Sequence, residues 1–189
     1  CTQCSAPLPA EAPNNRCGHC QKLPPAFDTT TALFHYQPPV DYLIKRLKFA
    51  RELGIVPLLA ALLSARLATR AAALPSLLVP VPLHRTRLRE RGFNQAAELA
   101  RRVGRELGIR SNHRLCRRTR NTQPQSLLSP NARRLNLRKA FSIQGRDIAR
   151  HIAIVDDVMT TGHTSNELAR VLKQAGAERV EVWVIARAG

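Results

Sequence analysis

Aromatic residues and long apolar runs are both scarce in this 189-residue sequence. Phe, Trp and Tyr together make up 4% of the residues, so the sequence shows no base-stacking platform of the kind that RNA-recognition domains use. No segment approaches the roughly 18 uninterrupted apolar residues of a membrane-spanning helix. The most apolar segment, residues 53–67, is interrupted by Pro57, Ser64 and Arg66, and we expect it to form a buried helix.

Internal repeats, low-complexity tracts and a lysine-bearing P-loop are also missing. The sequence contains no Gly-Lys-Ser or Gly-Lys-Thr, which argues against a nucleoside triphosphatase. The apolar fraction of 44% is sufficient for a hydrophobic core. The length has room for one α/β domain of about 150 residues and a small additional module.

Acidic residues are few: 13 Asp and Glu stand against 30 Lys and Arg, a formal net charge of +17. The positive charge is concentrated in residues 85–139, which hold 16 basic side chains and three acidic ones, a net charge of +13. A basic face can serve solubility alone. At this density we favour a polyanionic partner, which would be pyrophosphate, nucleic acid or both.

The most informative run covers residues 152–164, where an apolar strand leads into two acids and then into a Thr/Gly-rich loop. The apolar residues 152–155 suit a strand buried on both faces of a parallel sheet. Asp156 and Asp157 would lie at its carboxyl end, where open α/β sheets bind ligands. A helix with a 3.6-residue apolar period is expected at 165–175.

This arrangement predicts a site for a ribose 5-phosphate. The loop at 160–164 would present free N–H groups and the positive end of the helix dipole to a phosphate. Asp156 and Asp157 would accept hydrogen bonds from two vicinal sugar hydroxyls. The alternative is that the Thr and Gly residues only cap the helix. We favour the ribose phosphate, because strand, acids and helix follow one another in register.

Cysteines are concentrated at the start of the sequence. The pairs Cys1-x2-Cys4 and Cys17-x2-Cys20 have the spacing of a four-thiolate zinc ribbon, in which the metal is structural because no coordination position stays open. Two disulfides are the alternative, but the sequence shows no signal peptide, and the fifth cysteine, Cys116, would be left without a partner. We therefore expect reduced thiols and a structural zinc. Since the sequence begins at Cys1 without an initiator Met, we also expect further residues before it.

The remaining elements are expected in the order of an α/β fold. Residues 1–24 form the metal module, and residues 25–189 form the main domain. The expected elements are a strand at 27–36, a helix after Pro38 and Pro39, a second helix at 53–72, a short strand at 76–81, a helix following Asn94 and a last strand at 180–186.

Four arginines lie in the segment that follows the strand at 76–81, which we interpret as a strand-to-helix loop. Guanidinium groups bind phosphate oxygens in pairs, so Arg85, Arg87 and Arg91 are predicted to bind pyrophosphate. His84 is interpreted as a surface hydrogen-bonding residue rather than a catalytic base. Asn94 or a neighbour would cap the next helix.

A third basic segment follows at residues 117–141. Its first half, 117–129, is polar and contains a proline, and we interpret it as a mobile loop; its second half, 133–141, is predicted to be a helix leading back to the sheet. The loop could act as a lid that excludes water, or as an ordinary connector. The candidate nucleic-acid-binding residues are Arg117, Arg118, Arg120, Arg133, Arg134, Arg138 and Lys139.

The run at 152–164 resembles the phosphoribosyl pyrophosphate (PRPP) signature of type I phosphoribosyltransferases. With the Arg-Glu-Arg-Gly-Phe-Asn-Gln run at 89–95 and the basic stretch at 122–137, it resembles the ComF family, which includes GntX-like members. The resemblance covers nearly the whole sequence. It implies a type I phosphoribosyltransferase-like parallel sheet flanked by helices, with a small N-terminal zinc ribbon, in a bacterial cytoplasmic protein linked to natural competence or to the use of external DNA.

The resemblance also implies roles for individual residues. Asp156 and Asp157 would be the catalytic pair, and Mg²⁺ would accompany PRPP between its pyrophosphate and its ribose hydroxyls. The implied PRPP-binding residues are Asp156, Asp157, Val158, Met159, Thr160, Thr161, Gly162, His163 and Thr164.

Two functions remain open from the sequence. The first is a PRPP-binding protein that also binds single-stranded DNA through its basic face, with competence-machinery proteins as further partners. The second is an active phosphoribosyltransferase with an unknown acceptor. Because the sequence ends just after its last strand, an acceptor pocket would have to come from residues 1–50, where no nucleobase-binding pattern is evident. We therefore favour the first.

Overall fold

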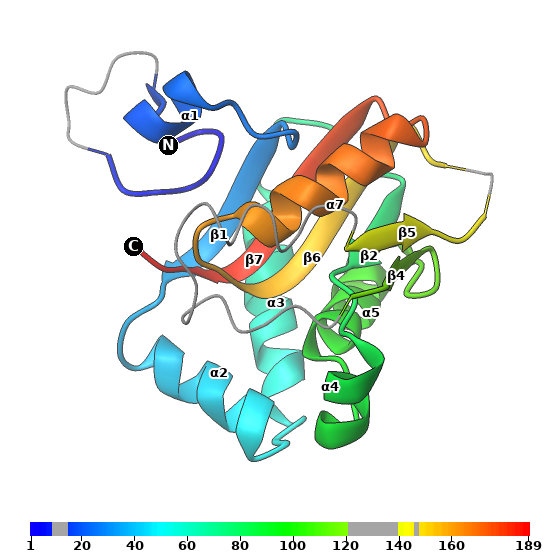
Figure 1. Ribbon diagram of the computed structural model, residues 1–189. Coiled ribbons are helices and arrows are strands. Elements are labelled where there is room, and N and C mark those ends of the chain that lie inside the picture. Colours follow the sequence, from blue (N-terminus) through cyan, green and yellow to red (C-terminus); the bar gives the residue numbers. More distant parts are fainter. Residues whose placement is uncertain (9–14, 121–139, 146–147) are drawn as a thin grey trace.

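The protein is described here from a computed structural model that covers residues 1–8, 15–120, 140–145 and 148–189 (Figure 1). Its centre is a five-stranded parallel sheet in the order β1-β7-β6-β2-β3. These strands are β1 Thr29–His35, β2 Leu77–Pro80, β3 Arg110–Ser111, β6 His151–Met159 and β7 Arg179–Arg187. A separate antiparallel pair consists of β4 Cys116–Arg118 and β5 Phe141–Ile143. The expected parallel α/β sheet is confirmed.

Helices cover both faces of this sheet. They are α1 Gly18–Lys22, α2 Val40–Phe49, α3 Ile55–Ala68, α4 Arg85–Arg91, α5 Gln95–Leu107 and α7 His163–Gln174. Helix α7 lies across one face, and α3 and α5 lie on the other (Figure 1). Alternate residues of β6 point to opposite faces, so Ile154 packs with Leu168 of α7, whereas Val155 packs with Leu99 of α5.

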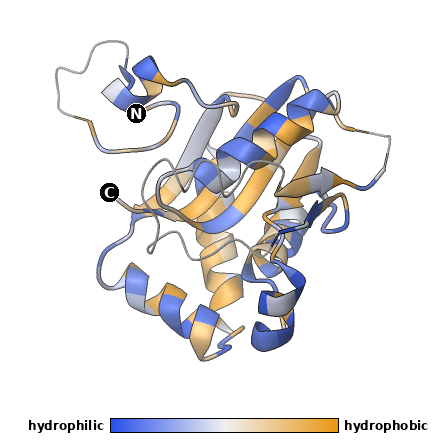
Figure 2. Cartoon of the chain, viewed as in Figure 1, coloured by the Kyte–Doolittle hydropathy of each residue, from blue (hydrophilic) through white to orange (hydrophobic). Residues whose placement is uncertain are grey.

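The two central strands are apolar along most of their length, as the orange segments of Figure 2 show. Residues 152–155 of β6 and 182–186 of β7 are buried, and Trp183 has no exposed surface. With helices on both faces, such strands carry a continuous apolar run instead of an alternating one, as predicted for residues 152–155. Among the residues that the structure describes, no helix has the length and apolarity to cross a membrane.

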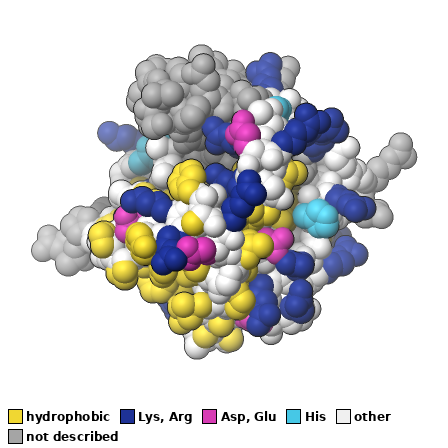
Figure 3. Space-filling model, turned by 90° about the horizontal axis from the view of Figure 1, so that it is seen from below, with side chains coloured by type: hydrophobic (Ala, Val, Ile, Leu, Met, Phe, Trp, Pro, Cys, Tyr) yellow, Lys and Arg dark blue, Asp and Glu magenta, His cyan; other side chains and the backbone are white. Residues whose placement is uncertain are grey.

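Helix α3 differs from the expectation of a buried helix. Leu59 and Leu63 are buried against the sheet and α5, but Leu58 and Leu62 are 55% and 41% exposed. The helix is apolar on all sides, yet only one side has a packing partner among the described residues. Figure 3, a view from below, shows hydrophobic side chains at the surface among Lys and Arg.

The arginine-rich segment at 85–91 was expected to be a loop, and it is helix α4. The side chain of His84 accepts a hydrogen bond from the backbone N–H of Thr86 at 3.3 Å and caps the helix. Gly92 ends it in the left-handed conformation, with φ +82°. The prediction of a loop was wrong because the helix is short: its cap, His84, and its stop signal, Gly92, are only eight residues apart, so the segment shows little helical periodicity in the sequence.

The prediction of a loop beginning at residue 117 was also wrong. Arg117 and Arg118 belong to β4, which pairs with β5. Cys116, the first residue of β4, is buried. Phe141, expected at the end of a helix, is the first residue of β5. The rest of the expected loop and helix, residues 121–139, lies outside the described part of the chain.

Candidate functional site

The two acids lie in β6 at the point where its neighbour β2 ends and only β7 remains paired with it. Strand β2 ends at Pro80, opposite Val155, whereas β6 stays paired with β7 as far as Met159. Asp156 and Asp157 therefore lie just beyond the end of β2, but they lie within β6, which continues to Met159 instead of ending before the acids as expected. Asp156 is partly exposed and Asp157 is 2% exposed.

A lysine from α2 contacts this acid pair. Nζ of Lys48 lies 2.7 Å from Oδ2 of Asp157. Lys48 follows buried Ile44 by four residues, so it lies on the inward face of its helix. The sequence analysis missed Lys48, and the only signal was a charged residue on an otherwise apolar face.

The acids influence one another strongly. Burial raises the pKa of Asp156 well above its usual range, and the neighbouring charge of Asp157 raises it further, while Lys48 opposes the rise. Each carboxylate also binds a backbone N–H: Oδ1 of Asp156 accepts from Asp157, and Oδ1 of Asp157 accepts from Val158, both at 2.9 Å. These bonds fix the orientation of both side chains.

Three arginines share the electrostatic environment of the acid pair. Burial lowers the pKa of Arg91, an effect that Asp157 and Asp156 oppose and Arg87 reinforces. Burial likewise lowers the pKa of Arg118; the charge of Arg87 lowers it further, and the charge of Asp156 opposes the change. Arg91 is held between the ring of Phe49, 5.8 Å away, and Oε1 of Gln95, at 2.7 Å. The structure thus gathers cations from α4 and β4 beside the acids.

The predicted pyrophosphate set is only partly assembled. Arg87 and Arg91 are half-buried beside the acids, but Arg85 is exposed in the first turn of α4. Arg118, which the sequence analysis assigned to nucleic acid, lies in this site instead. It packs on the ring of Phe141 at 5.7 Å, a contact that depends on the β4–β5 pairing.

The predicted phosphate loop connects β6 to α7. Gly162 immediately precedes the helix with φ +76°, and a Cβ atom there would lie 2.7 Å from Cε of Met159. The positive φ favours glycine, and any larger residue would also have to displace the end of the Met159 side chain. Thr160 and Thr161 are exposed, and Oγ1 of Thr161 lies 2.7 Å from Nδ1 of His163. The loop therefore presents hydroxyl groups and the first N–H groups of a three-turn helix to an anion.

The four N-terminal cysteines come together in a segment that we call the cysteine module, residues 1–8 and 15–22. The sulfur atoms of Cys1, Cys4, Cys17 and Cys20 all lie within 4.8 Å of one another, and those of Cys4 and Cys17 are 3.7 Å apart. A zinc tetrahedron has sulfur–sulfur edges of about 3.8 Å. All four are free thiols, so the alternative of two disulfides is not observed. The module has the geometry to hold a metal ion.

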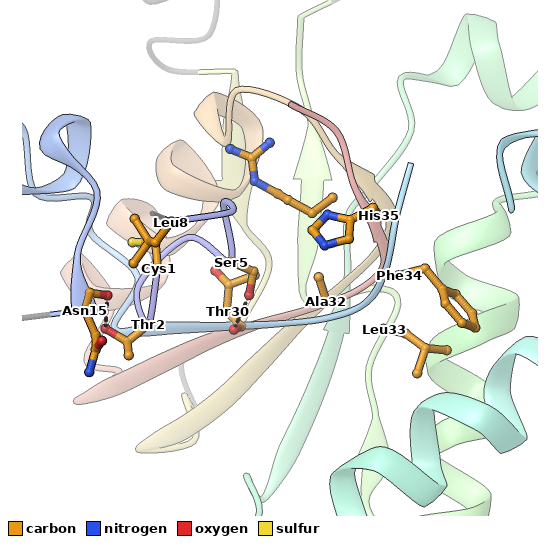
Figure 4. A pocket seen from close by; sticks show the side chains of 11 residues that line it. Cys1, Thr2, Ser5, Leu8, Asn15, Thr30, Ala32, Leu33, Phe34 and His35 are labelled. Atoms are coloured by element: carbon orange, nitrogen blue, oxygen red, sulfur yellow. Dashed lines mark hydrogen bonds between the residues drawn. The ribbon is translucent and has the colours of Figure 1, made fainter. Parts of the chain in front are cut away.

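The cysteine module is attached to the sheet close to the phosphate loop. Arg187 donates from Nε to the carbonyl oxygen of Cys4 at 2.9 Å and from Nη1 to that of Met159 at 3.4 Å. Ser5 donates to the carbonyl oxygen of Thr30 in β1 at 2.7 Å, beside a hollow of about 460 Å³ (Figure 4). Module and loop are thus positioned by the same arginine.

A larger pocket, of about 810 Å³, lies between the module and the start of α7. Residues 161–163 of the loop form one wall, and His19 with the Leu23-Pro24-Pro25 run forms another. Phe27 and Met159 also line it. The sequence analysis found no acceptor pocket in residues 1–50, because this one exists only where the module meets the loop.

The remaining candidate nucleic-acid-binding residues are divided. Arg117 and Arg120 are exposed, on β4 and just after it. Arg133, Arg134, Arg138 and Lys139 lie outside the described residues.

Comparison with known proteins finds one matching family and several relatives. The family described as phosphoribosyl transferase domain matches residues 88–189. "Competence protein F" of Haemophilus influenzae is 38% identical over 197 residues, which cover 100% of this chain and 84% of that protein. "DNA utilization protein YhgH" of Escherichia coli K12 is 38% identical over 191 residues, covering 99% and 83%. "Competence protein ComFC" of Streptococcus pneumoniae is 28% identical over 157 residues, covering 82% and 67%.

Proposed function

Because the chain belongs to the ComF family of proteins with a phosphoribosyltransferase domain, we propose that it binds PRPP at the acid pair and the loop that follows it. One observation carries the proposal. The acid pair of β6 is followed in the chain by the loop that leads into α7, and the charges of both acids act on Arg91 of α4, so acceptors for a diol are accompanied by two candidate sites for phosphate.

Each part of PRPP has a counterpart in this site. The 5-phosphate binds the N-terminus of α7 and the hydroxyls of residues 160–164. The ribose hydroxyls donate to the acid pair, and the pyrophosphate binds Arg87, Arg91 and Arg118, all of which are half-buried and so interact with it more strongly than exposed arginines would. Mg²⁺, bound through the oxygens of PRPP itself, would neutralise charge on the pyrophosphate.

The test is a calorimetric titration of the Asp156→Asn/Asp157→Asn double variant with PRPP and Mg²⁺. We expect binding to be lost, since neutral amides are weaker acceptors for two hydroxyls. Glu178→Gln, a change at an exposed acid in the same fold, is the control and should bind as the unchanged protein does. Equal affinity in the double variant would refute the assignment.

We further propose that the basic face binds single-stranded DNA in a cytoplasmic protein of bacterial competence or DNA use, together with competence-machinery proteins. The names of the relatives and the net charge of residues 85–139 support this proposal. Affinity for a fluorescent oligonucleotide should fall steeply as salt rises, because bound phosphates release counterions. Arg117→Gln/Arg120→Gln should weaken binding more than the charge-matched Arg66→Gln/Arg150→Gln. A flat salt response would remove this proposal.

The pocket of about 810 Å³ favours a second candidate, an active phosphoribosyltransferase. The pocket adjoins the phosphate loop, where an acceptor for the ribosyl group would have to enter. Residues 1–24 would then be a zinc ribbon that forms one wall of the site on a phosphoribosyltransferase-like domain at 25–189, with Cys1, Cys4, Cys17 and Cys20 as the zinc ligands. Screening nucleobases and related heterocycles for PRPP-dependent release of pyrophosphate tests this candidate.

A further inference from the structure

The two carboxylates of the acid pair are not equivalent. In Asp157, Oδ1 accepts a hydrogen bond from the backbone N–H of Val158 at 2.9 Å, whereas the buried Oδ2 has no hydrogen-bond partner among the described residues and lies 2.7 Å from Nζ of Lys48 in an ion pair. Its side chain is 3% exposed. Asp156 is partly exposed and forms no ion pair with any side chain in the described part of the chain.

Lys48 is held in place by its helix. Ile44 and Leu47 bury the inner face of α2, and the side chain of Lys48 is itself only 22% exposed. Phe49, the next residue, packs against Arg91 of α4. The end of α2 therefore meets the acid pair and one of its flanking arginines at the same time.

The charges around the pair explain why a cation is needed there. Asp156 and Asp157 are adjacent, and two neighbouring carboxylates cannot both ionise at low cost without a compensating charge. Both acids act electrostatically on Arg91 of α4, and Asp156 also acts on Arg118 of β4, but these guanidinium groups are among those proposed for pyrophosphate. Lys48 is the described cation that lies in ion-pair contact with the pair.

From this geometry we propose that Lys48 is a positioning residue that occupies Asp157, so that Asp156 alone receives the ribose hydroxyls. The proposal rests on the proposed function, since it says which carboxylate of the same site binds the ribose hydroxyls. Lys48 and Asp157 then act as one neutral unit beneath the ligand. Asp156 supplies the contact that distinguishes a hydroxylated sugar from a deoxy sugar.

The test is a double-mutant cycle read by the binding of PRPP with Mg²⁺. Lys48→Met and Asp157→Asn should each weaken binding by about 10- to 100-fold, because each leaves one buried charge without its partner. The combination Lys48→Met/Asp157→Asn should recover most of the loss, because a neutral pair replaces an ion pair. Lys48→Arg should stay close to the unchanged protein. A double variant no better than the worse single one would show that Asp157 contacts the ligand itself and would overturn the proposal.

A second readout separates sugar recognition from folding. Ribose 5-phosphate and 2-deoxyribose 5-phosphate are compared on each variant, and thermal unfolding shows that each is folded. The preference for the hydroxylated sugar should persist in Lys48→Met/Asp157→Asn and disappear in Asp156→Asn. A preference that survives Asp156→Asn would refute the assignment to Asp156. If the unchanged protein binds neither PRPP nor ribose 5-phosphate, the proposed function fails first, and this inference fails with it.

Discussion

Arg187 and Cys4 are joined by a hydrogen bond of 2.9 Å from the guanidinium Nε to the carbonyl oxygen. The same guanidinium lies 3.4 Å from the carbonyl oxygen of Met159, the last residue of β6 before the phosphate loop. Arg187 is 9% exposed, so both bonds are shielded from water. The cysteine module and the candidate ribose-phosphate site are thus physically connected through one buried side chain.

Removing this connection should loosen the module without unfolding the sheet. In Arg187→Met, we expect faster hydrogen exchange in residues 1–8 and 15–22 and in the loop at 160–162, because the backbone carbonyl groups of Cys4 and Met159 lose a shared donor. Arg150→Met, which removes an arginine that is 83% exposed, is the control and should leave both regions unchanged. Unaltered exchange in the module would contradict the connecting role of Arg187.

The cysteine cluster predicts one tightly bound zinc per chain. Cys4→Ser should lower the zinc content, measured by elemental analysis of chelator-free protein, and should lower the melting temperature, because metal binding contributes directly to folding. Cys116→Ser is the matched control: this thiol is buried outside the cluster, and burial alone raises its pKa to about 12. A full complement of zinc in Cys4→Ser would refute the cluster as the metal site.

Replacing Gly162 is predicted to weaken ligand binding as well as stability, whereas replacing a glycine outside the loop should lower stability alone. In Gly162→Ala, the new Cβ meets Met159 and the left-handed backbone is strained by about 1 kcal/mol, so PRPP affinity should fall together with stability. Gly108→Ala has a similar backbone, with φ +68°, but nothing within 4 Å of the new Cβ. We expect this control to lose stability and keep its affinity. Equal affinities in the two variants would show that the loop does not bind the ligand.

Glu181 predicts acid sensitivity at the opposite end of the sheet. Its carboxylate is 1% exposed and accepts hydrogen bonds from Arg70, His151 and Trp183, which hold its pKa at about 2 despite burial. The usual value is 4.5, so the stabilisation is complete above pH 4.5 and is lost as the pH falls from 4.5 towards 2. The contribution is on the order of 3 kcal/mol.

Urea unfolding at pH 7 and at pH 3 measures this contribution. Glu181→Gln should lose about 3 kcal/mol at pH 7 and much less at pH 3, relative to the unchanged protein. Glu178→Gln, at a side chain that is 64% exposed, should change little at either pH. A loss that is the same at both pH values would show that packing, and not the charge of Glu181, stabilises this end of the sheet.

The sequence predicted best those features that depend on neighbouring residues. The apolar run before Asp156 defines a central strand, and Gly162 marks the start of α7, so the core of the candidate site could be found by reading one segment. The fold class followed from the order of strands and helices. Helix α4 was missed because the cap at His84 and the stop at Gly92 also fit a loop.

Contacts between distant segments were not predictable in the same way. Lys48 meets Asp157 only because α2 packs next to the sheet, and no local pattern links the two residues. The pocket beside the loop likewise depends on where Arg187 holds the cysteine module. Arg118 was grouped with the basic residues around it, because the pairing of β4 with β5, which places it against Phe141, could not be predicted from those residues.

The measurement that tests the central claim most directly is a calorimetric titration of the purified protein with PRPP and Mg²⁺. The account predicts saturable binding at one site per chain, competed by ribose 5-phosphate and by pyrophosphate. The absence of saturable binding by the folded protein would contradict it and would show that the acid pair and its loop do not form a ribose-phosphate site.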